Sequence, residues 1–233
     1  KIMAKLDIAE RRLPQDGRIP LRVPGETRLA AACLVYDAAG RRVARYDKIH
    51  LFDVGIPGKD ERYQESSSVR PGATPVCVDT PAGRLGLAVC YDLRFPELFR
   101  RLLGLGAKWF CLPAAFTAPT GRAHWEVLLR ARAIENLCHV VAPAQSGFHE
   151  NGRETHGDSM IVDCWGRVLA RLPRGTGVVA AEIDLVRQDL LAWGPRLAEL
   201  NLRLVRDAAR GDRVRLPAPP MLAMELEHVR GAP

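Results

Sequence analysis

The feature that most constrains the fold is a series of short apolar runs separated by turn residues. Residues 30–37 and Arg41–Tyr46 are two such runs, and the turn sequence Asp37–Gly40 joins them. Residues 75–79 and 85–89 repeat the pattern around a Pro-Ala-Gly turn. Because paired strands of this kind leave apolar faces that must be covered, we expect sheets that stack on one another.

Helical patterns are fewer than strand patterns. A helix is predicted over Pro96–Leu103, where Gly104 ends it. A second helix is predicted over His124–Asn136, because its apolar residues recur at steps of three and four. Further strands are predicted at Trp109–Leu112, His139–Ala144, Asp158–Asp163, Arg167–Ala170 and Val178–Ile183. This order predicts an α/β protein in which helices cover the outside of stacked sheets.

The composition is that of a globular protein with one substantial core. A chain of 233 residues with 47% hydrophobic residues is long enough to bury such a core without division. No apolar run approaches the length of a membrane span, and the charged N-terminus is not a signal peptide, so we expect no membrane association. The net charge of +7 comes mostly from scattered arginines, so we expect no nucleic-acid partner.

Cysteine and histidine spacing argues against disulfides and metal sites. The six cysteines lie far apart with no CxxC pair, and most of them fall in or beside apolar stretches. Free buried thiols in a reducing compartment explain this pattern best, so we expect a cytoplasmic protein. The histidines show no HExxH spacing, and the chain has no glycine-rich phosphate loop, so we expect no metal and no cofactor.

Cys90 has the sequence context of a nucleophile. The apolar run Leu85–Val89 stops at this residue, polar chain follows, and Pro96 is suited to open a helix. A strand that runs into such a turn presents a side chain near helical N–H groups, which favour the thiolate. The alternative is that Cys90 is one more structural buried cysteine.

Two charged residues upstream of Cys90 are candidates for the same site. Lys48 follows a predicted strand, and Glu65 follows seventeen residues later in a predicted loop. A thiol, an ammonium and a carboxylate in one pocket could attack a carbonyl carbon, stabilise the oxyanion and accept a proton. A lysine in this position is otherwise a surface charge, and spacing alone does not show that the three residues converge.

The chain resembles the nitrilase superfamily of carbon–nitrogen hydrolases over residues 19 to about 190. The matching motifs are RYDKIHLFDVGIP (Arg45–Pro57), YQES (Tyr63–Ser66), GLAVCYDLRFPELF (Gly86–Phe99) and DSMIVDCWGRV (Asp158–Val168). The resemblance implies an α-β-β-α sandwich that forms homodimers and hydrolyses amides through a cysteine thioester. It implies that Cys90 is the nucleophile and that Lys48 and the Tyr91 backbone N–H stabilise the tetrahedral intermediate. Glu65 would be the second, positioning glutamate.

Within this superfamily, the chain is most similar to the deaminated glutathione amidase branch. The motifs that carry this similarity are PAAFTAPTGRAHWEVLLRARAIE (Pro113–Glu135) and VAPAQSG (Val141–Gly147). The substrate implied is a small non-peptide amide of the deaminated glutathione type, or a related omega-amide, that bears carboxylates. Arg94, Thr117 and His124 are candidate substrate contacts, and structural roles for all three are equally open.

The family's general-base glutamate has no counterpart in this sequence. In the family pattern that glutamate lies on a Pro-Glu pair upstream of the lysine, whereas here the only upstream glutamates are Glu10 and Glu26, neither in such a context. We therefore expect the first strand–helix unit to be absent. Loss of a general base typically lowers rates about 10²–10⁴-fold. The alternative to an amidase is thus a catalytically impaired scaffold or interaction protein.

The two ends of the chain match the superfamily less well than the middle. Lys1–Ile19 resembles a segment of type II secretion and type IV pilus assembly ATPases, without a Walker motif, and a third interpretation makes it a partner-binding piece. Residues beyond 190 predict an amphipathic helix and then a proline-rich stretch. We expect a foreign or leader segment at 1–18, a hydrolase domain at 19–190 and an unmatched tail at 191–233.

Overall fold

The computed structural model describes residues 19–55, 62–150, 152–186 and 188–189. These residues fall within the first of two compact units, Lys1–Asp189. The predicted leader at 1–18 and the predicted tail at 191–233 lie outside the described residues, so the two domain boundaries remain predictions. Within the described part of the chain, no helix is both long and apolar enough to cross a membrane.

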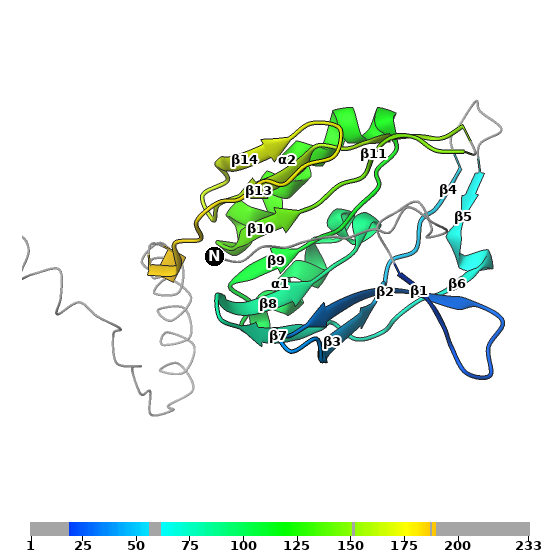
Figure 1. Ribbon diagram of the computed structural model, residues 1–233, viewed down its shortest axis with the longest axis horizontal. Coiled ribbons are helices and arrows are strands. Elements are labelled where there is room, and N and C mark those ends of the chain that lie inside the picture. The colour runs from blue at the N-terminus through cyan, green and yellow to red at the C-terminus, as the bar shows by residue number, and fades with distance from the viewer. Residues whose placement is uncertain (1–18, 56–61, 151, 187, 190–233) are drawn as a thin grey trace, which may run out of the picture. The chain divides into compact units, whose positions relative to one another are not determined.

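A six-stranded sheet forms the centre of the fold. Its strand order is β14-β13-β10-β9-β8-β7, and β8, β9 and β10 are parallel to one another (Figure 1). The central side chains Leu87, Phe110 and Val140 are fully buried, as parallel strands covered on both faces require. The strands are β7 (Cys77–Thr80), β8 (Gly83–Leu87), β9 (Trp109–Cys111), β10 (His139–Ala142), β13 (Ser159–Val162) and β14 (Val168–Leu172).

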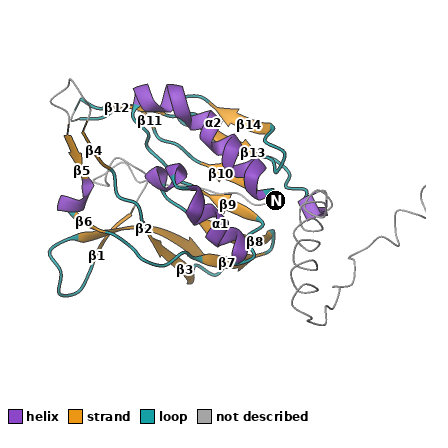
Figure 2. Ribbon diagram, turned by 180° about the vertical axis from the view of Figure 1, so that it is seen from behind, coloured by secondary structure: helices purple, strands orange, loops and turns teal. Residues whose placement is uncertain are grey.

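Two α-helices of the described residues cover one face of this sheet. Figure 2 shows α1 (Pro96–Gly104) and α2 (Ala118–Asn136) in front of its strands. α2 begins six residues before the predicted start at His124, because Pro119 lies in the first helical turn, where a missing N–H costs nothing. A Cβ at Gly121 would lie 2.2 Å from the Cβ of His156. The close approach of α2 to His156 therefore requires a glycine at position 121.

A four-stranded sheet supplies a further layer. Its central strand β2 (Leu29–Tyr36) pairs with β1 (Ile19–Arg22), β3 (Arg42–Asp47) and β6 (Val69–Arg70). Side chains from β2 and β3 share one hydrophobic core with β8, and β3 contacts β7. The predicted α/β, nitrilase-like class is confirmed. Among the described residues the layers are helix, sheet and sheet, and neither described α-helix forms the outer layer expected beyond the second sheet.

Most predicted elements are present, with one clear error. The strand predicted at Val178–Ile183 is wrong: the structure assigns no strand there, and Val178 is 77% exposed. An apolar run does not make a strand unless another strand bonds to it, and the pairing ends with β14. Besides β1 and β6, the sequence pattern also missed four short strands and two 3-10 turns. These are β4 (Asp53–Gly55), β5 (Arg62–Gln64), η1 (Glu65–Ser67), η2 (Cys90–Arg94), β11 (Ser146–Phe148) and β12 (Glu154–His156).

Candidate active site

Cys90 lies in a strained turn between a strand and a helix. It is the first residue of η2, three residues after β8, and its φ of +50° is left-handed. A non-glycine residue in this region costs on the order of 1 kcal/mol, so the surroundings must hold it there. The Cys90 N–H donates to the carbonyl of Pro113 at 2.9 Å, and the side chain is 8% exposed. The predicted location of Cys90 in a strand-to-helix turn agrees with the structure.

Lys48 and Glu65 form a buried ion pair. Lys48 Nζ lies 2.7 Å from Glu65 Oε2, and the two residues are 1% and 9% exposed. The same carboxylate oxygen accepts the backbone N–H of Phe52 at 2.6 Å. Buried charges require partners of this kind, because an uncompensated charge in the interior is strongly unfavourable. The structure thus brings together a lysine and a glutamate whose convergence sequence spacing could not show.

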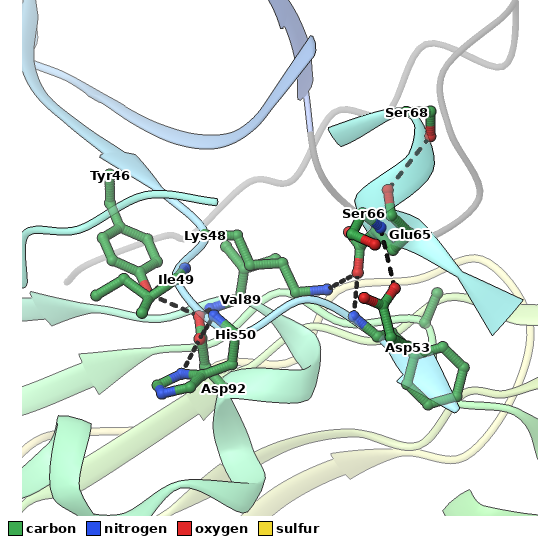
Figure 3. Close-up of polar contacts among 12 residues, drawn as sticks. Tyr46, Lys48, Ile49, His50, Asp53, Glu65, Ser66, Ser68, Val89 and Asp92 are labelled. Atoms are coloured by element: carbon green, nitrogen blue, oxygen red, sulfur yellow. Dashed lines mark hydrogen bonds and ion pairs between the residues drawn. The ribbon is translucent and has the colours of Figure 1, made fainter. Parts of the chain in front are cut away.

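Asp92 connects the Lys48 segment to the Cys90 turn. Its carboxylate is fully buried, and it accepts hydrogen bonds from Tyr46 Oη and the Val89 N–H, both at 2.8 Å (Figure 3). It also lies 3.1 Å from the backbone nitrogen of His50 and 2.7 Å from His50 Nδ1. Residues on both sides of Lys48 are therefore bonded to the residue two positions after Cys90.

Asp92 is a residue that the sequence interpretation missed. The only local signal for it is an aspartate in the first turn after a strand end, where a carboxylate can accept nearby backbone N–H groups. Tyr46 lies on a strand in the other sheet, so nothing in the sequence relates it to Asp92. Burial and the neighbouring Asp92 charge raise the pKa of Tyr46 well above its usual range, so its hydroxyl stays protonated and donates.

A row of aromatic rings lies along the same segments. The His50 ring stacks on Phe95 with centroids 3.7 Å apart, and Phe95 contacts Tyr91 edge-on at 5.5 Å. Tyr91 contacts Phe52 at 5.0 Å, and Phe52 contacts Tyr63 at the same distance. Since Tyr91 follows Cys90 and Phe52 bonds to Glu65, these ring contacts join the loops that carry the charged pair and the thiol.

The candidate substrate residues are only partly brought together. Arg94 Nη1 and Nη2 each lie 3.3 Å from Nδ1 of His124, an exposed residue on α2. The Arg94 guanidinium also lies over the rings of Tyr91 and Phe116, at 5.8 Å and 5.4 Å. Thr117 bonds elsewhere: its hydroxyl lies 2.7 Å from that of Thr120 in the first turn of α2. Arg94 therefore places a guanidinium next to Tyr91 and within hydrogen-bond distance of the His124 ring.

The remaining cysteines have structural environments. None of the six cysteines forms a disulfide in the structure. Burial raises the pKa of Cys33 to about 11 and also raises the pKa values of Cys77 and Cys111, so these three are protonated at neutral pH. Over the residues that the structure covers, no group of three or more His, Cys, Asp or Glu side chains is arranged to hold a metal ion.

Comparisons with known proteins relate this arrangement to one family. Residues 9–191 match the family model described as carbon-nitrogen hydrolase. A deaminated glutathione amidase of Yersinia enterocolitica is 49% identical over 156 residues, which cover 67% of this chain and 54% of that protein. The crystal structure of the Caenorhabditis elegans NitFhit protein has a TM-score of 0.70 and 46% identity, covering 74% of this chain and 42% of that one.

A solved amidase shows chemistry at its own cysteine. The enzyme from Nesterenkonia sp. AN1 is 28% identical with a TM-score of 0.56, and the match covers 65% of this chain and 54% of that chain. A mutant of that amidase carries the acetamide moiety of fluoroacetamide, covalently added at the active-site cysteine. The present chain spans about half the length of these relatives.

Proposed function

Since this chain belongs to the carbon–nitrogen hydrolase family, we propose that it hydrolyses the C–N bond of a small amide, with Cys90 as the nucleophile. The observation that carries the proposal is the buried Lys48–Glu65 ion pair, which hydrogen bonds through Asp92 connect to the strained Cys90 turn. A buried ammonium, on a segment that is bonded to the turn that presents a thiol, is suited to stabilise negative charge that develops on a carbonyl oxygen. The covalent cysteine adduct in the Nesterenkonia amidase supports the nucleophile assignment.

The reaction proceeds in two steps. The Cys90 sulfur bonds to the amide carbonyl carbon, and the tetrahedral intermediate holds its oxyanion near Lys48 Nζ and the Tyr91 N–H. The C–N bond then breaks, the leaving nitrogen takes the proton that came from the thiol, and a thioester remains on Cys90. Water attacks the thioester carbon, the C–S bond breaks, and a carboxylic acid and the free thiol are released. Glu65 holds the Lys48 ammonium in place throughout.

The second candidate function is a catalytically impaired scaffold of the same fold. Without a group that accepts the Cys90 proton, attack by the thiol would be slow. The scaffold predicts that an electrophilic amide leaves Cys90 unlabelled at neutral pH.

The substrate we propose is an amide that carries carboxylates, of the deaminated glutathione type. Its support is twofold: the names of the similar proteins, and the Arg94 guanidinium beside Tyr91 and His124. Guanidinium groups bind carboxylates through paired N–H donors, which suits Arg94 to orient one end of such a substrate. Thr117 would contact the substrate only if its hydroxyl exchanged its bond to Thr120.

We further propose that the protein acts as a homo-oligomer in the cytoplasm. Large apolar side chains at Val127, Ile134 and Trp165 are 67%, 50% and 62% exposed, which is typical of a surface covered by another copy. Six cysteines with no disulfide among them support a reducing compartment. Sedimentation of the purified protein should give a mass above 25.7 kDa, and Val127→Glu should shift it toward the monomer.

The experiment that tests the function follows both product and covalent intermediate. The protein is incubated with deaminated glutathione, release of a primary amine is measured, and intact-protein mass spectrometry looks for an acyl adduct. Cys90→Ala should abolish both signals, whereas Cys77→Ala, at a half-buried thiol whose pKa is raised, should keep them. Equal amine release by the parent and by Cys90→Ala would overturn the proposal, and an electrophilic amide that leaves Cys90 unlabelled would favour the scaffold.

A further inference from the structure

We propose that Asp92 is the positioning residue that sets the location of Lys48 relative to Cys90, an inference that rests on the proposed function. Asp92 is fully buried and does not contact solvent, so it acts through its neighbours rather than on a substrate. Its hydrogen-bond partners Tyr46 and His50 flank Lys48, and its partner Val89 precedes Cys90 (Figure 3).

The two carboxylate oxygens of Asp92 have different hydrogen-bond partners. Oδ2 accepts Tyr46 Oη and the Val89 N–H, so it joins the strand before Lys48 to the residue before Cys90. Oδ1 lies 3.1 Å from the His50 nitrogen and 2.7 Å from His50 Nδ1, so it holds the chain after Lys48. An ionised carboxylate has about four acceptor sites, and these four contacts use them.

The Tyr46 hydroxyl extends the same arrangement toward Lys48. It donates to Asp92 and accepts the backbone N–H of Ile49 at 3.2 Å. The Lys48 backbone is separately fixed, because its N–H donates to Ala31 and its carbonyl accepts from Gly72, both at 2.8 Å. The β-sheet therefore fixes where the Lys48 backbone lies, and Asp92 fixes where the Cys90 turn lies against it.

An amide cannot replace this carboxylate. In Asp92→Asn one of the two oxygens becomes an NH₂ group, which donates, so the donors that faced that oxygen lose their acceptor. Either the bonds from Tyr46 and Val89 or those from His50 are then lost, and the two segments shift apart. A misplacement of about 1 Å between reacting groups lowers rates roughly 10²-fold. We expect kcat to fall by about that factor while KM changes less than about threefold, since the substrate contacts remain.

The test uses a readout that does not require turnover. The rate at which iodoacetamide alkylates Cys90 is measured against pH by peptide mass spectrometry in the parent and in Asp92→Asn. Tyr46→Phe removes only the hydroxyl that donates to Asp92 and is therefore the milder variant. It keeps the test valid if Asp92→Asn does not fold. The matched controls are Asp163→Asn, at a buried aspartate that bonds to N–H groups in the β13–β14 turn, and Tyr36→Phe, at an exposed tyrosine.

The expected result is a change confined to the Asp92 network. Asp92→Asn and Tyr46→Phe should move the midpoint of the alkylation profile to higher pH, because the Lys48 ammonium that favours the thiolate is displaced. The controls should keep the parental profile. A folded Tyr46→Phe and a folded Asp92→Asn with parental profiles and parental kcat would overturn the inference. A parent without amidase activity whose Cys90 profile still shifts in Asp92→Asn would refute the hydrolysis and support the positioning.

Discussion

Glu65→Gln removes the charge that compensates the buried Lys48 ammonium and leaves the side-chain shape almost unchanged. Breaking a buried ion pair from one side typically costs 3–5 kcal/mol, because the remaining charge stays in the interior. The glutamine oxygen can still accept from Lys48 Nζ and from the Phe52 N–H, which lie 2.7 Å and 2.6 Å from the present carboxylate oxygen. We therefore expect the free energy of unfolding to fall by about 3 kcal/mol, the lower end of that range.

A double-mutant cycle separates the charge effect from the loss of packing. Lys48→Met alone strands the Glu65 carboxylate and should also cost about 3 kcal/mol, whereas the double variant carries no buried charge at this point. Its cost should be about 2 kcal/mol instead of the sum of about 6, which gives a coupling free energy of about 4 kcal/mol. If Lys48 stabilises the oxyanion as proposed, Lys48→Met and the double variant should both lose activity, although the double variant is the more stable of the two.

The measurement is urea unfolding at pH 7 of the parent, both single variants and the double variant. The matched control is the exposed pair of Arg84 and Asp79, whose side chains are 41% and 80% exposed, with Arg84→Gln and Asp79→Asn. A surface pair of this kind should show a coupling below about 0.5 kcal/mol. If the effects of Glu65→Gln and Lys48→Met simply add to within about 0.5 kcal/mol, the argument that these charges compensate each other in the interior is refuted.

Three further variants test local physical arguments. Burial raises the pKa of Cys33 from 9.0 to about 11, so the free energy of unfolding falls as pH rises through this window. In Cys33→Ala the slope of this free energy against pH, measured by urea unfolding, should be smaller by on the order of 1.4 kcal/mol per pH unit. Burial lowers the pKa of His139 from 6.5, so its contribution to the free energy of unfolding is present above pH 6.5 and is lost as pH falls below it. His139→Gln should reduce this loss when unfolding is followed at decreasing pH. An unchanged slope of the free energy of unfolding against pH would contradict the argument. Gly121→Ala would push a Cβ against His156 and should cost about 1–3 kcal/mol by thermal unfolding, whereas Gly104→Ala meets nothing within 4 Å and should not destabilise.

The sequence predicted the elements whose ends depend on neighbouring residues in the chain. Cys90 was expected in a strand-to-helix turn because an apolar run stops there, and the structure has this turn. Pro96 opens α1 as expected, because proline fits the first helical turn. The start of α2 was placed too late, since its first turn lacks the apolar periodicity on which the prediction depended.

Contacts across long sequence separations could not be predicted in the same way. The Lys48–Glu65 pair depends on where two loops lie relative to each other, and the sequence interpretation left their convergence open. Asp92 was missed because its main partner Tyr46 belongs to a different sheet. Val178 shows the reverse case, in which an apolar run predicts a strand but no neighbouring strand pairs with it. These features depend on tertiary packing, which overrides local propensity.

The hydrogen bond between Tyr46 and Asp92 joins residues 46 positions apart. The three parallel strands β8, β9 and β10 also pair only through long crossover connections. Contacts of this range require closure of long loops, so they form late and slowly. If Cys90 is the nucleophile proposed above, a newly made or partly refolded chain consequently carries it as an ordinary thiol until the native state is complete. Immature copies should therefore react with electrophiles only at the rate of an ordinary cysteine.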